Sequence, residues 1–280
     1  MKGMTLVELL VALLLGLVLM VGTLKLYSHG ALTYRFSEDT ARLQERGRYV
    51  LSTLEPDIEL AGFHGLTNAA LTGELPAAID LCGLGRTRPV GSCTPIASSG
   101  DTLALRRVET SSVAAEPGRL QVYSARLTGR GAPLLFSDGE VPGPVDADHT
   151  VHNLVVRAYY VAPSPAAPAL RVKSLTSVSG SPAFIDTEVM PGVEDLQVQF
   201  GIAADGVTQY VNPGFAGLDS AHVVAVRVWV RIRADERSQA LSDTNTYQYA
   251  DVTYQPAGDE RHFRRAVVSR TIALRNARTS

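Results

Sequence analysis

A glycine stands directly before a long apolar run at the start of this 280-residue chain. Gly3 and Met4 precede the apolar residues, whereas an ordinary secretory signal has its cleavage site after them. A peptidase that cuts between Gly3 and Met4 would therefore leave the apolar segment on the mature protein. These residue types indicate proteolytic processing that retains an N-terminal anchor.

Glu8 places a carboxylate inside the apolar run. A charged group within a lipid bilayer is costly, and it is normally compensated by a partner. Two interpretations remain open from the residues alone. Either Glu8 pairs with a cationic group, or it reaches the lipid headgroups from the end of the helix and has no specific partner.

The apolar stretch runs from Met4 to Leu26, and Glu8 is its only charge before Lys25. As a helix these residues would span roughly 35 Å, which is enough to cross a hydrocarbon core of about 30 Å. We therefore predict a membrane-spanning helix rather than a helix buried in a globular core. Lys2 precedes the helix and no basic cluster follows it, so we expect the N-terminus in the cytoplasm and the rest of the chain in the periplasm.

Small residues interrupt the apolar run at Ala12, Gly16 and Gly22. Ala12 and Gly16 form a small-xxx-small pair, which lets two helices approach closely in lipid. Glycine is also common in membrane helices without any packing role. A helix-packing role for these three residues is thus one of two interpretations.

A second apolar periodicity predicts that the helix continues beyond the membrane. Its apolar positions recur at intervals of three, four or seven, with charged residues between them, and they are Leu32, Phe36, Leu43, Gly47, Val50, Leu54 and Ile58. A helix from Thr5 to Leu54 would be about 75 Å long. Pro56 is expected to stop or kink it, because proline lacks a backbone donor and its ring clashes with the preceding turn. A resumed helix is a further expectation for residues 57–60.

The residues after Gly65 are typical of β-strands. Segments rich in Val, Tyr, Thr and Leu often alternate in polarity, and they cover residues 101–109, 119–127, 151–161, 195–202, 222–234 and 264–275. Turns rich in Pro, Gly and Ser separate them, including SDGEVPGP and APSPAAP. We expect one head with a mostly antiparallel sheet packed on the second half of the helix.

No catalytic motif is visible in the sequence. It contains no GxSxG, HExxH or GxxxxGK[ST] pattern, and its six histidines are scattered. Asp146, Asp148 and His149 are conceivable metal ligands, but a DADHT string is more typical of a solvated turn. Asp205 and Gly206 indicate a hairpin turn rather than a calcium loop. We expect neither an enzyme nor a bound cofactor or metal.

Cys82 and Cys93 enclose ten residues of a loop-like stretch. In the periplasm a disulfide is the natural expectation, and closing such a loop contributes about 3 kcal/mol in the chain-entropy model. A zinc site is the first alternative, although no CxxC pair or nearby histidine cluster completes four ligands. Two free thiols are the second.

The C-terminal stretch is basic. It carries Arg261, Arg264, Arg265, Arg270, Arg275 and Arg278. Such a cluster could contact DNA or an acidic neighbour. The whole chain is nearly balanced, with 26 basic and 28 acidic residues, which favours arginines at alternate positions of a strand that faces water.

Two segments carry a resemblance to a known family. GMTLVELL, at residues 3–10, resembles the processing and assembly signal of type IV pilins and of the pseudopilins of type II secretion. QERGRYVLSTLEPDIELAGFHG, at residues 44–65, is similar to the corresponding segment of PilW-type minor pilins. A looser likeness extends to residues 193–202, 222–233 and the C-terminus. Met4 departs from the family pattern, which most often has phenylalanine there.

The resemblance implies an α+β, type IV pilin-like fold. It implies a long N-terminal helix, with a transmembrane half and an amphipathic half, packed on a mostly antiparallel β-sheet head. The corresponding division is a leader peptide at 1–3, a transmembrane helix at 4–26, an amphipathic spine and turn at 27–65, and a periplasmic β-rich head at 66–280.

The resemblance also implies roles for the first residues. A prepilin peptidase would cut after Gly3 and the new terminus at Met4 would be N-methylated. Glu8, with Thr5 beside it, would belong to the subunit assembly segment, where the carboxylate pairs with the terminal ammonium of a neighbouring subunit.

A function follows from the same resemblance. The chain is expected to be a minor pilin that primes or enters a type IV pilus and supports motility, adhesion or DNA uptake. Its partners would be other minor pilins, the major pilin, the prepilin peptidase and the assembly platform of the inner membrane; DNA is not expected to be one. A type II secretion pseudopilin is the first alternative. A membrane-tethered periplasmic enzyme or sensor is an alternative of another class.

Overall fold

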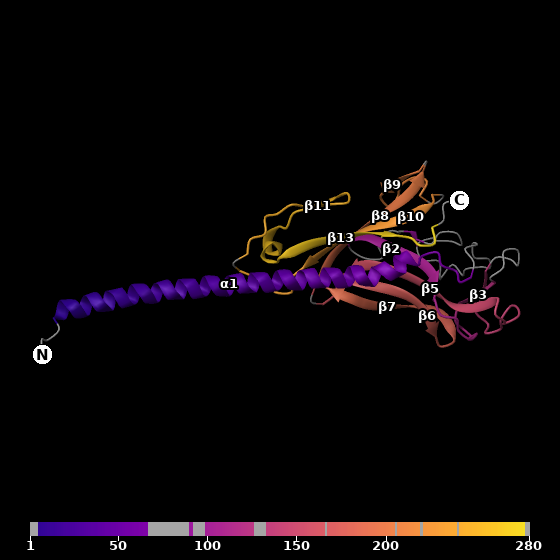
Figure 1. The fold of residues 1–280 in the computed structure, drawn as a ribbon, viewed down its shortest axis with the longest axis horizontal. Helices are drawn as coiled ribbons and strands as arrows, with labels where there is room; N and C mark the ends of the chain where they lie inside the picture. The colour runs from indigo at the N-terminus through magenta and orange to yellow at the C-terminus, as the bar shows by residue number, and fades with distance from the viewer. Residues whose placement is uncertain are drawn as a thin grey trace.

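The computed structural model describes residues 5–66, 90–91, 99–125, 133–165, 167–204, 206–218, 221–239 and 241–277. One long helix leaves a β-rich head, and the N-terminus lies at the end of the helix that is far from the head (Figure 1). The architecture is therefore α+β, as the sequence predicts.

Helix α1, Leu6–Glu59, has 54 residues and is about 80 Å long at 1.5 Å per residue. Its N-terminal part, Leu6–Gly30, has a mean hydropathy of 2.5 and no buried residue. This segment is long and apolar enough to cross a membrane.

The second half of α1 packs on the head along one stripe. Leu43, Val50, Leu54 and Ile58 are each 2% exposed or less, which confirms the apolar periodicity from Leu43 on, whereas Phe36 is 53% exposed. Gly47 lies on this stripe because a side chain would not fit there, since a Cβ on it would stand 2.7 Å from Cγ1 of Val268. The helix and strand therefore approach closely at this point.

Pro56 does not stop the helix, because α1 continues through it to Glu59, which confirms helix after Pro56. The ring removes one hydrogen bond in the last turn, but the next two residues are held by the head. Asp57 and Ile58 are both buried, and the backbone N–H of Leu60 still donates to the carbonyl of Pro56 at 3.1 Å. Tertiary contacts thus outweigh the local effect of proline.

The head contains two larger antiparallel sheets and one small hairpin. The first sheet has seven strands, which are β1 (Val90–Gly91), β2 (Ser99–Val108), β5 (His149–Ala162), β3 (Gln121–Ala125), β4 (Leu134–Phe136), β6 (Ala169–Val178) and β7 (Ser181–Pro191). The long strand β5 pairs with β3 through its first residues and with β6 through its last ones, while β2 runs along its other edge.

The second sheet has the order β13-β10-β8-β9. Its strands are β13 (Arg265–Ala273), β10 (Val223–Arg233), β8 (Val193–Ala204) and β9 (Val207–Val211). The small hairpin joins β11 (Tyr247–Tyr249) and β12 (Val252–Tyr254), and the 3-10 helix η3 (Gly258–His262) precedes β13.

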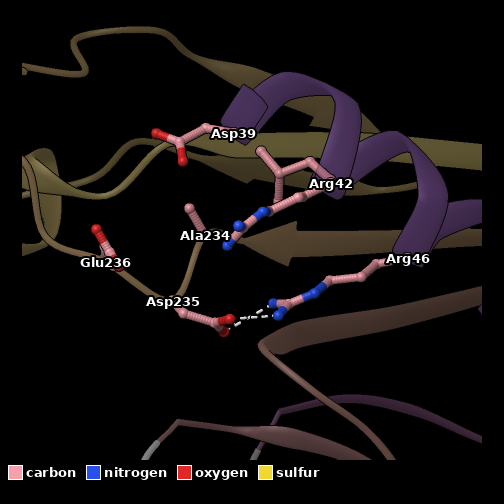
Figure 2. A pocket seen from close by; sticks show the side chains of 7 residues that line it. Asp39, Arg42, Arg46, Ala234, Asp235 and Glu236 are labelled. Atoms are coloured by element: carbon pink, nitrogen blue, oxygen red, sulfur yellow. Dashed lines mark hydrogen bonds and ion pairs between the residues drawn. The ribbon is translucent and has the colours of Figure 1, made fainter. Parts of the chain in front are cut away.

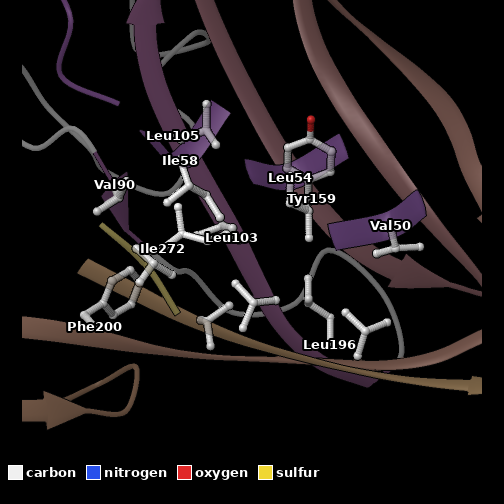
Figure 3. Close-up of a cluster of buried hydrophobic side chains, with 14 of the residues drawn as sticks. Val50, Leu54, Ile58, Val90, Leu103, Leu105, Tyr159, Leu196, Phe200 and Ile272 are labelled. Carbon is white, nitrogen blue, oxygen red and sulfur yellow. The ribbon is translucent and has the colours of Figure 1, made fainter. Parts of the chain in front are cut away.

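The main core lies between the two sheets and the end of α1. Figure 3 shows side chains from the helix, from β2 and β5 of the first sheet, and from β8 and β13 of the second. Burial of these side chains, at about 25 cal/mol per Å² of apolar surface, is the main force that fixes the helix on the head.

All six predicted strand segments are strands in the structure, namely β2, β3, β5, β8, β10 and β13. SDGEVPGP and APSPAAP lie in the connections from β4 to β5 and from β5 to β6. Ala204 pairs with Val207, so the strands on either side of the turn predicted at 205–206 form a hairpin; Asp205 itself lies outside the described residues.

The sequence prediction omits the β6–β7 hairpin. Ser179 and Gly180, both at positive φ, form its two-residue turn, and a Ser-Gly dipeptide between two β-rich runs is the signal that would have found it.

Candidate functional site

The free half of α1 is the first candidate surface. The large apolar side chains from Leu6 to Leu26 are 46% to 75% exposed, and none of the described residues of the head covers them. A monomer in water would not leave such a surface open. This half of α1 therefore requires lipid or other protein around it.

Thr5 and Glu8 form a capping box at the start of α1. The Thr5 hydroxyl accepts the backbone N–H of Glu8 at 3.3 Å, and the Glu8 carboxylate accepts the backbone N–H of Thr5 at 3.0 Å. The pair thus satisfies two of the amides that a helix start leaves open. Sequence reasoning missed this role, although Thr5-x-x-Glu8 is the usual signature of the motif.

The capping box engages only one oxygen of Glu8. Both the Thr5 amide and the Thr5 hydroxyl donate to Oε2, at 3.0 and 3.2 Å. Within the described part of the chain, Oε1 has no partner. Glu8 can therefore cap its own helix and accept a further hydrogen bond or ion pair at the same time.

The small residues of the apolar run do not meet the rest of the chain. A Cβ on Gly16 or Gly22 would have nothing within 4 Å. Ala12 and Gly16 lie on one helix face, whereas Gly22 lies on another, since at about 100° per residue it is about 120° around the axis from Gly16. The three residues therefore do not form a single groove.

Asp57 anchors the last turn of α1 to the first sheet. It is 2% exposed, and its Oδ1 accepts Nε and Nη2 of Arg107 at 3.0 and 2.9 Å. Its Oδ2 accepts Nη1 of Arg157 at 2.7 Å and the hydroxyl of Tyr159 at 2.6 Å. Burial, together with this carboxylate, raises the pKa of Tyr159. One side chain of the helix thereby joins β2 and β5.

The C-terminal arginines face water only in part, because some of them also contact α1; the side chains of Arg270 and Arg275 are 40% and 68% exposed, and Arg278 lies outside the described residues. Arg270 pairs with Glu55 and Arg275 with Glu59, the latter at 2.6 Å. Arg264 lies 4.0 Å from Asp39 and stacks on the ring of Phe36, with 3.6 Å from its guanidinium carbon to the ring centroid. These three arginines therefore join the C-terminal segment to α1.

Arg265 is buried completely, so the interpretation as a water-facing residue is wrong for it. Its side chain is 0% exposed, and its Nε and Nη2 donate to the two oxygens of Glu194 at 2.8 and 2.9 Å. Arg231 donates to the same carboxylate at 3.1 Å. Burial alone would lower the pKa of Arg265, but its hydrogen bonds to Glu194 and that negative charge raise it.

A shallow cleft lies where α1 meets the head. It has a volume of about 360 Å³ including its open mouth, and its lining comes from residues 39–46 of α1 and from the segment after β10. Figure 2 shows Arg46 facing Asp235 across it. This ion pair raises the pKa of Arg46 and lowers that of Asp235. The charges of Arg46 and Asp235 neutralise each other here, so the cleft is a further contact between α1 and the head.

A family model matches the C-terminal part of the chain. Residues 158–276 match the model described as Type IV Pilus-assembly protein W. This stretch comprises the end of β5 and all strands from β6 to β13. Over these residues the chain is similar to PilW-type pilins. The apolar N-terminal helix followed by antiparallel sheets is the type IV pilin-like arrangement that the sequence predicts.

No curated protein matches the chain. Among solved structures, a type IV-like pilin from Thermus thermophilus is 15% identical, with a TM-score of 0.43, over 84% of this chain and 98% of that one.

Several residues singled out in the sequence lie outside the described residues. They are Gly3 and Met4 of the processing site, and Cys82 and Cys93 of the expected disulfide. Processing and the disulfide therefore stay predictions.

Asp146 and His149 belong to a local turn. The Asp146 carboxylate accepts the backbone N–H of Asp148 at 2.9 Å, and it lies 2.5 Å from Nδ1 of His149. The described residues contain no group of three metal-ligating side chains. The hydrogen bond from residue 148 back to residue 146 is typical of an Asx turn.

Proposed function

We propose that this chain is a PilW-type minor pilin that primes a type IV pilus or is built into it, with no catalytic activity of its own. The observation that carries the proposal is the free half of α1. It is a capped helical segment of 25 residues, Leu6–Gly30, which is mostly apolar and has no partner in the described head. The match to the PilW family model supports pilus components as its partners.

In this proposal the subunit stays inserted in the inner membrane until it is assembled. The N-terminus lies in the cytoplasm, the apolar half of α1 crosses the inner membrane, and the head lies in the periplasm. A prepilin peptidase removes residues 1–3 and Met4 is methylated. The apolar helix then moves from lipid into contact with the helices of other minor pilins and the major pilin.

Glu8 has a defined part in this transfer. Its Oε2 remains in the capping box and its Oε1 accepts the terminal ammonium of a neighbouring subunit. A charge buried among helices needs such a partner more than a charge near headgroups does. The same residue therefore serves as a cap in the monomer and as an ion-pair partner in the assembly.

The capping box makes a sharp experiment possible. Glu8→Gln keeps a side chain that can cap Thr5, because Gln replaces Glu in this motif, but it removes the charge. Glu8→Ala removes both the cap and the charge. Thr5→Ala removes the hydroxyl of the cap and leaves the carboxylate in place.

Each variant should be expressed in a strain that lacks the native protein, at equal membrane levels. Surface pili and co-purification with the other minor pilins are then measured. We expect Glu8→Gln and Glu8→Ala to be equally defective, and Thr5→Ala to be close to wild type. If Glu8→Gln assembles like the wild type, Glu8 is a helix cap only. If secretion of exported proteins fails while pili persist, the chain is a type II secretion pseudopilin instead.

A further inference from the structure

The outward face of the second sheet has one arginine without an acidic partner. Along β10 the outward side chains alternate, and they are Arg227, Trp229, Arg231 and Arg233. Arg231 and Arg233 both lie close to carboxylates, those of Glu194 and Glu260. In the described part of the chain, Arg227 has no carboxylate within ion-pair distance; its Nε donates to the Thr271 hydroxyl at 3.1 Å.

The chain itself shows how this face is covered at one end. The β11–β12 hairpin lays Tyr254 on Arg231, with 3.5 Å from the guanidinium carbon to the ring centroid, while Glu194 supplies the negative charge. The hydroxyl of Tyr249 donates to Asp195 at 2.7 Å. An arginine, an aromatic ring and a carboxylate thus meet where a strand of the chain lies on the sheet.

Two of these three components are present at Arg227. The ring of Tyr210 lies 3.9 Å from the Arg227 guanidinium carbon, and the ring of Trp229 lies 5.7 Å from it. Tyr210 can lie there because a Cβ on Gly201 would stand only 3.1 Å from it. The carboxylate is the missing component.

The polar groups around Arg227 include one charge and several neutral groups. Arg227, Trp229 and Tyr210 are all partly exposed. The terminal N–H groups of Arg227 and the indole N–H of Trp229 have no acceptor among the described residues. Gln199, opposite Arg227 on β8, donates its amide to Asn212 at 2.7 Å, and Ser269 and Thr271 on β13 are exposed. The surface is therefore cationic and flanked by aromatic rings.

We propose that this face, which we call the Arg227 face and define as Tyr210, Arg227, Trp229, Ser269 and Thr271, binds an acidic segment of a neighbouring protein. A Glu or Asp of that segment pairs with Arg227, and an apolar side chain beside it packs on Trp229. The charge of Arg227 selects the carboxylate, and the covered end of the same face shows that a strand fits here. Arg, Trp and Tyr are also the residues that dominate binding at protein interfaces.

The Arg227 face is independent of the proposed role of Glu8. It lies on the head, on the side of the second sheet that faces away from α1, since the opposite side carries Val268 against Gly47. A pilin with an inactive Arg227 face would still be processed and inserted. Failure of one proposal therefore leaves the other standing.

Site-specific photo-crosslinking tests the face in the full chain in its native membrane. Ser269 is replaced by p-benzoylphenylalanine, and Val178, which is 45% exposed on the other sheet, serves as the matched control position. The crosslinked peptide is identified by mass spectrometry. Arg227→Glu and Arg227→Gln are combined with the Ser269 probe. Circular dichroism of each purified variant reports that it is folded, because the emission of Trp229 itself depends on Arg227 beside it.

We expect a crosslink from position 269 to a protein segment that contains Asp or Glu, with a yield well above that of position 178. Arg227→Glu should lower this yield at least about tenfold, as loss of an interface arginine does, and Arg227→Gln should lower it as well. Reversing the charge of the acidic residue in the identified segment should restore the yield with Arg227→Glu.

Three results would overturn the proposal. The first is a yield at position 269 no greater than at position 178. The second is a crosslink to nucleic acid, to glycan or to a protein segment without an acidic residue. The third is a yield that folded Arg227→Glu and Arg227→Gln leave unchanged.

Discussion

Removal of the Asp57 carboxylate is the perturbation whose effect the structure defines best. Asp57 accepts two hydrogen bonds from Arg107, one from Arg157 and one from Tyr159. In Asp57→Ala the two guanidinium groups lose their negative partner and the Tyr159 hydroxyl loses its acceptor. The substitution therefore uncouples the last turn of α1 from β2 and β5.

The expected cost depends on how much water reaches each group that remains. The Arg107 side chain is only 13% exposed, so it stays poorly hydrated, whereas the Arg157 side chain is 36% exposed. Breaking a buried ion pair by removing one partner costs about 3 to 5 kcal/mol. Because Arg157 can be rehydrated, we expect Asp57→Ala to lower the free energy of unfolding by about 3 to 4 kcal/mol.

Denaturant unfolding of the full chain in detergent measures this cost, with the emission of Trp229 as the signal from the head. Glu38→Ala is the matched control, since it removes an ion pair with Arg42 on the exposed surface of the same helix. That control should cost no more than about 0.5 kcal/mol. A loss below about 1 kcal/mol in Asp57→Ala would refute the account of Asp57 as a buried anchor.

Three further predictions concern packing, pH and the cysteines. Gly47→Leu should lower the free energy of unfolding by about 1 to 3 kcal/mol, because overpacking against β13 outweighs the gain in helix propensity. Gly30→Leu should not lower it, because there is open space around a Cβ at position 30. Equal melting curves for the two variants would contradict the close contact between Gly47 and Val268. Burial raises the pKa of Asp101 to about 6, so the folded state binds more protons than the unfolded state between about pH 4 and pH 6 and stability falls as pH rises through that window. Asp101→Asn should remove this pH dependence and raise the free energy of unfolding at pH 7 by about 1 to 2 kcal/mol, discounted for partial exposure. If the free energy of unfolding changes between pH 4 and pH 7 as much in Asp101→Asn as in the wild type, Asp101 is not the group responsible. Cys82 and Cys93 of periplasm-derived protein should resist a thiol reagent until a reductant is added, and full labelling of the folded head without reductant would exclude the disulfide.

The local rules of helix and strand formation account for much of the fold. The 3.6-residue period of α1 identifies the side chains that meet the head, and alternation identifies β2, β5, β8 and β10. Both patterns are strong because burial selects one face of each element. The β6–β7 hairpin has a weaker pattern, since most of its residues are half-buried or exposed.

Long-range pairing could not be predicted from the sequence. Nothing local in the C-terminal segment shows that Arg265 is buried against Glu194 while Arg270 pairs with Glu55. Asp57 was likewise predicted only as part of a resumed helix, because its partners are 50 and 100 residues away. Charges at alternate positions of a strand look alike on both faces of a sheet until the tertiary fold is known.

The capping box shows a different kind of limit. The spacing of Thr5 and Glu8 is a local signal for a capping box, and it is visible in the sequence without any knowledge of the tertiary fold. Capping the helix does not exclude the proposed ion pair with a neighbouring subunit, since one carboxylate oxygen of Glu8 has no hydrogen-bond partner among the described residues.

The N-terminal mass of the protein tests the central claim most directly. The full chain is isolated from membranes and from sheared surface fibres of cells with an active prepilin peptidase, and its N-terminal peptide is identified by mass spectrometry. The account predicts a chain that begins at N-methylated Met4 in both fractions. A chain that still begins at Met1 in the membrane and is absent from the fibres would contradict assignment of this protein as an assembled minor pilin.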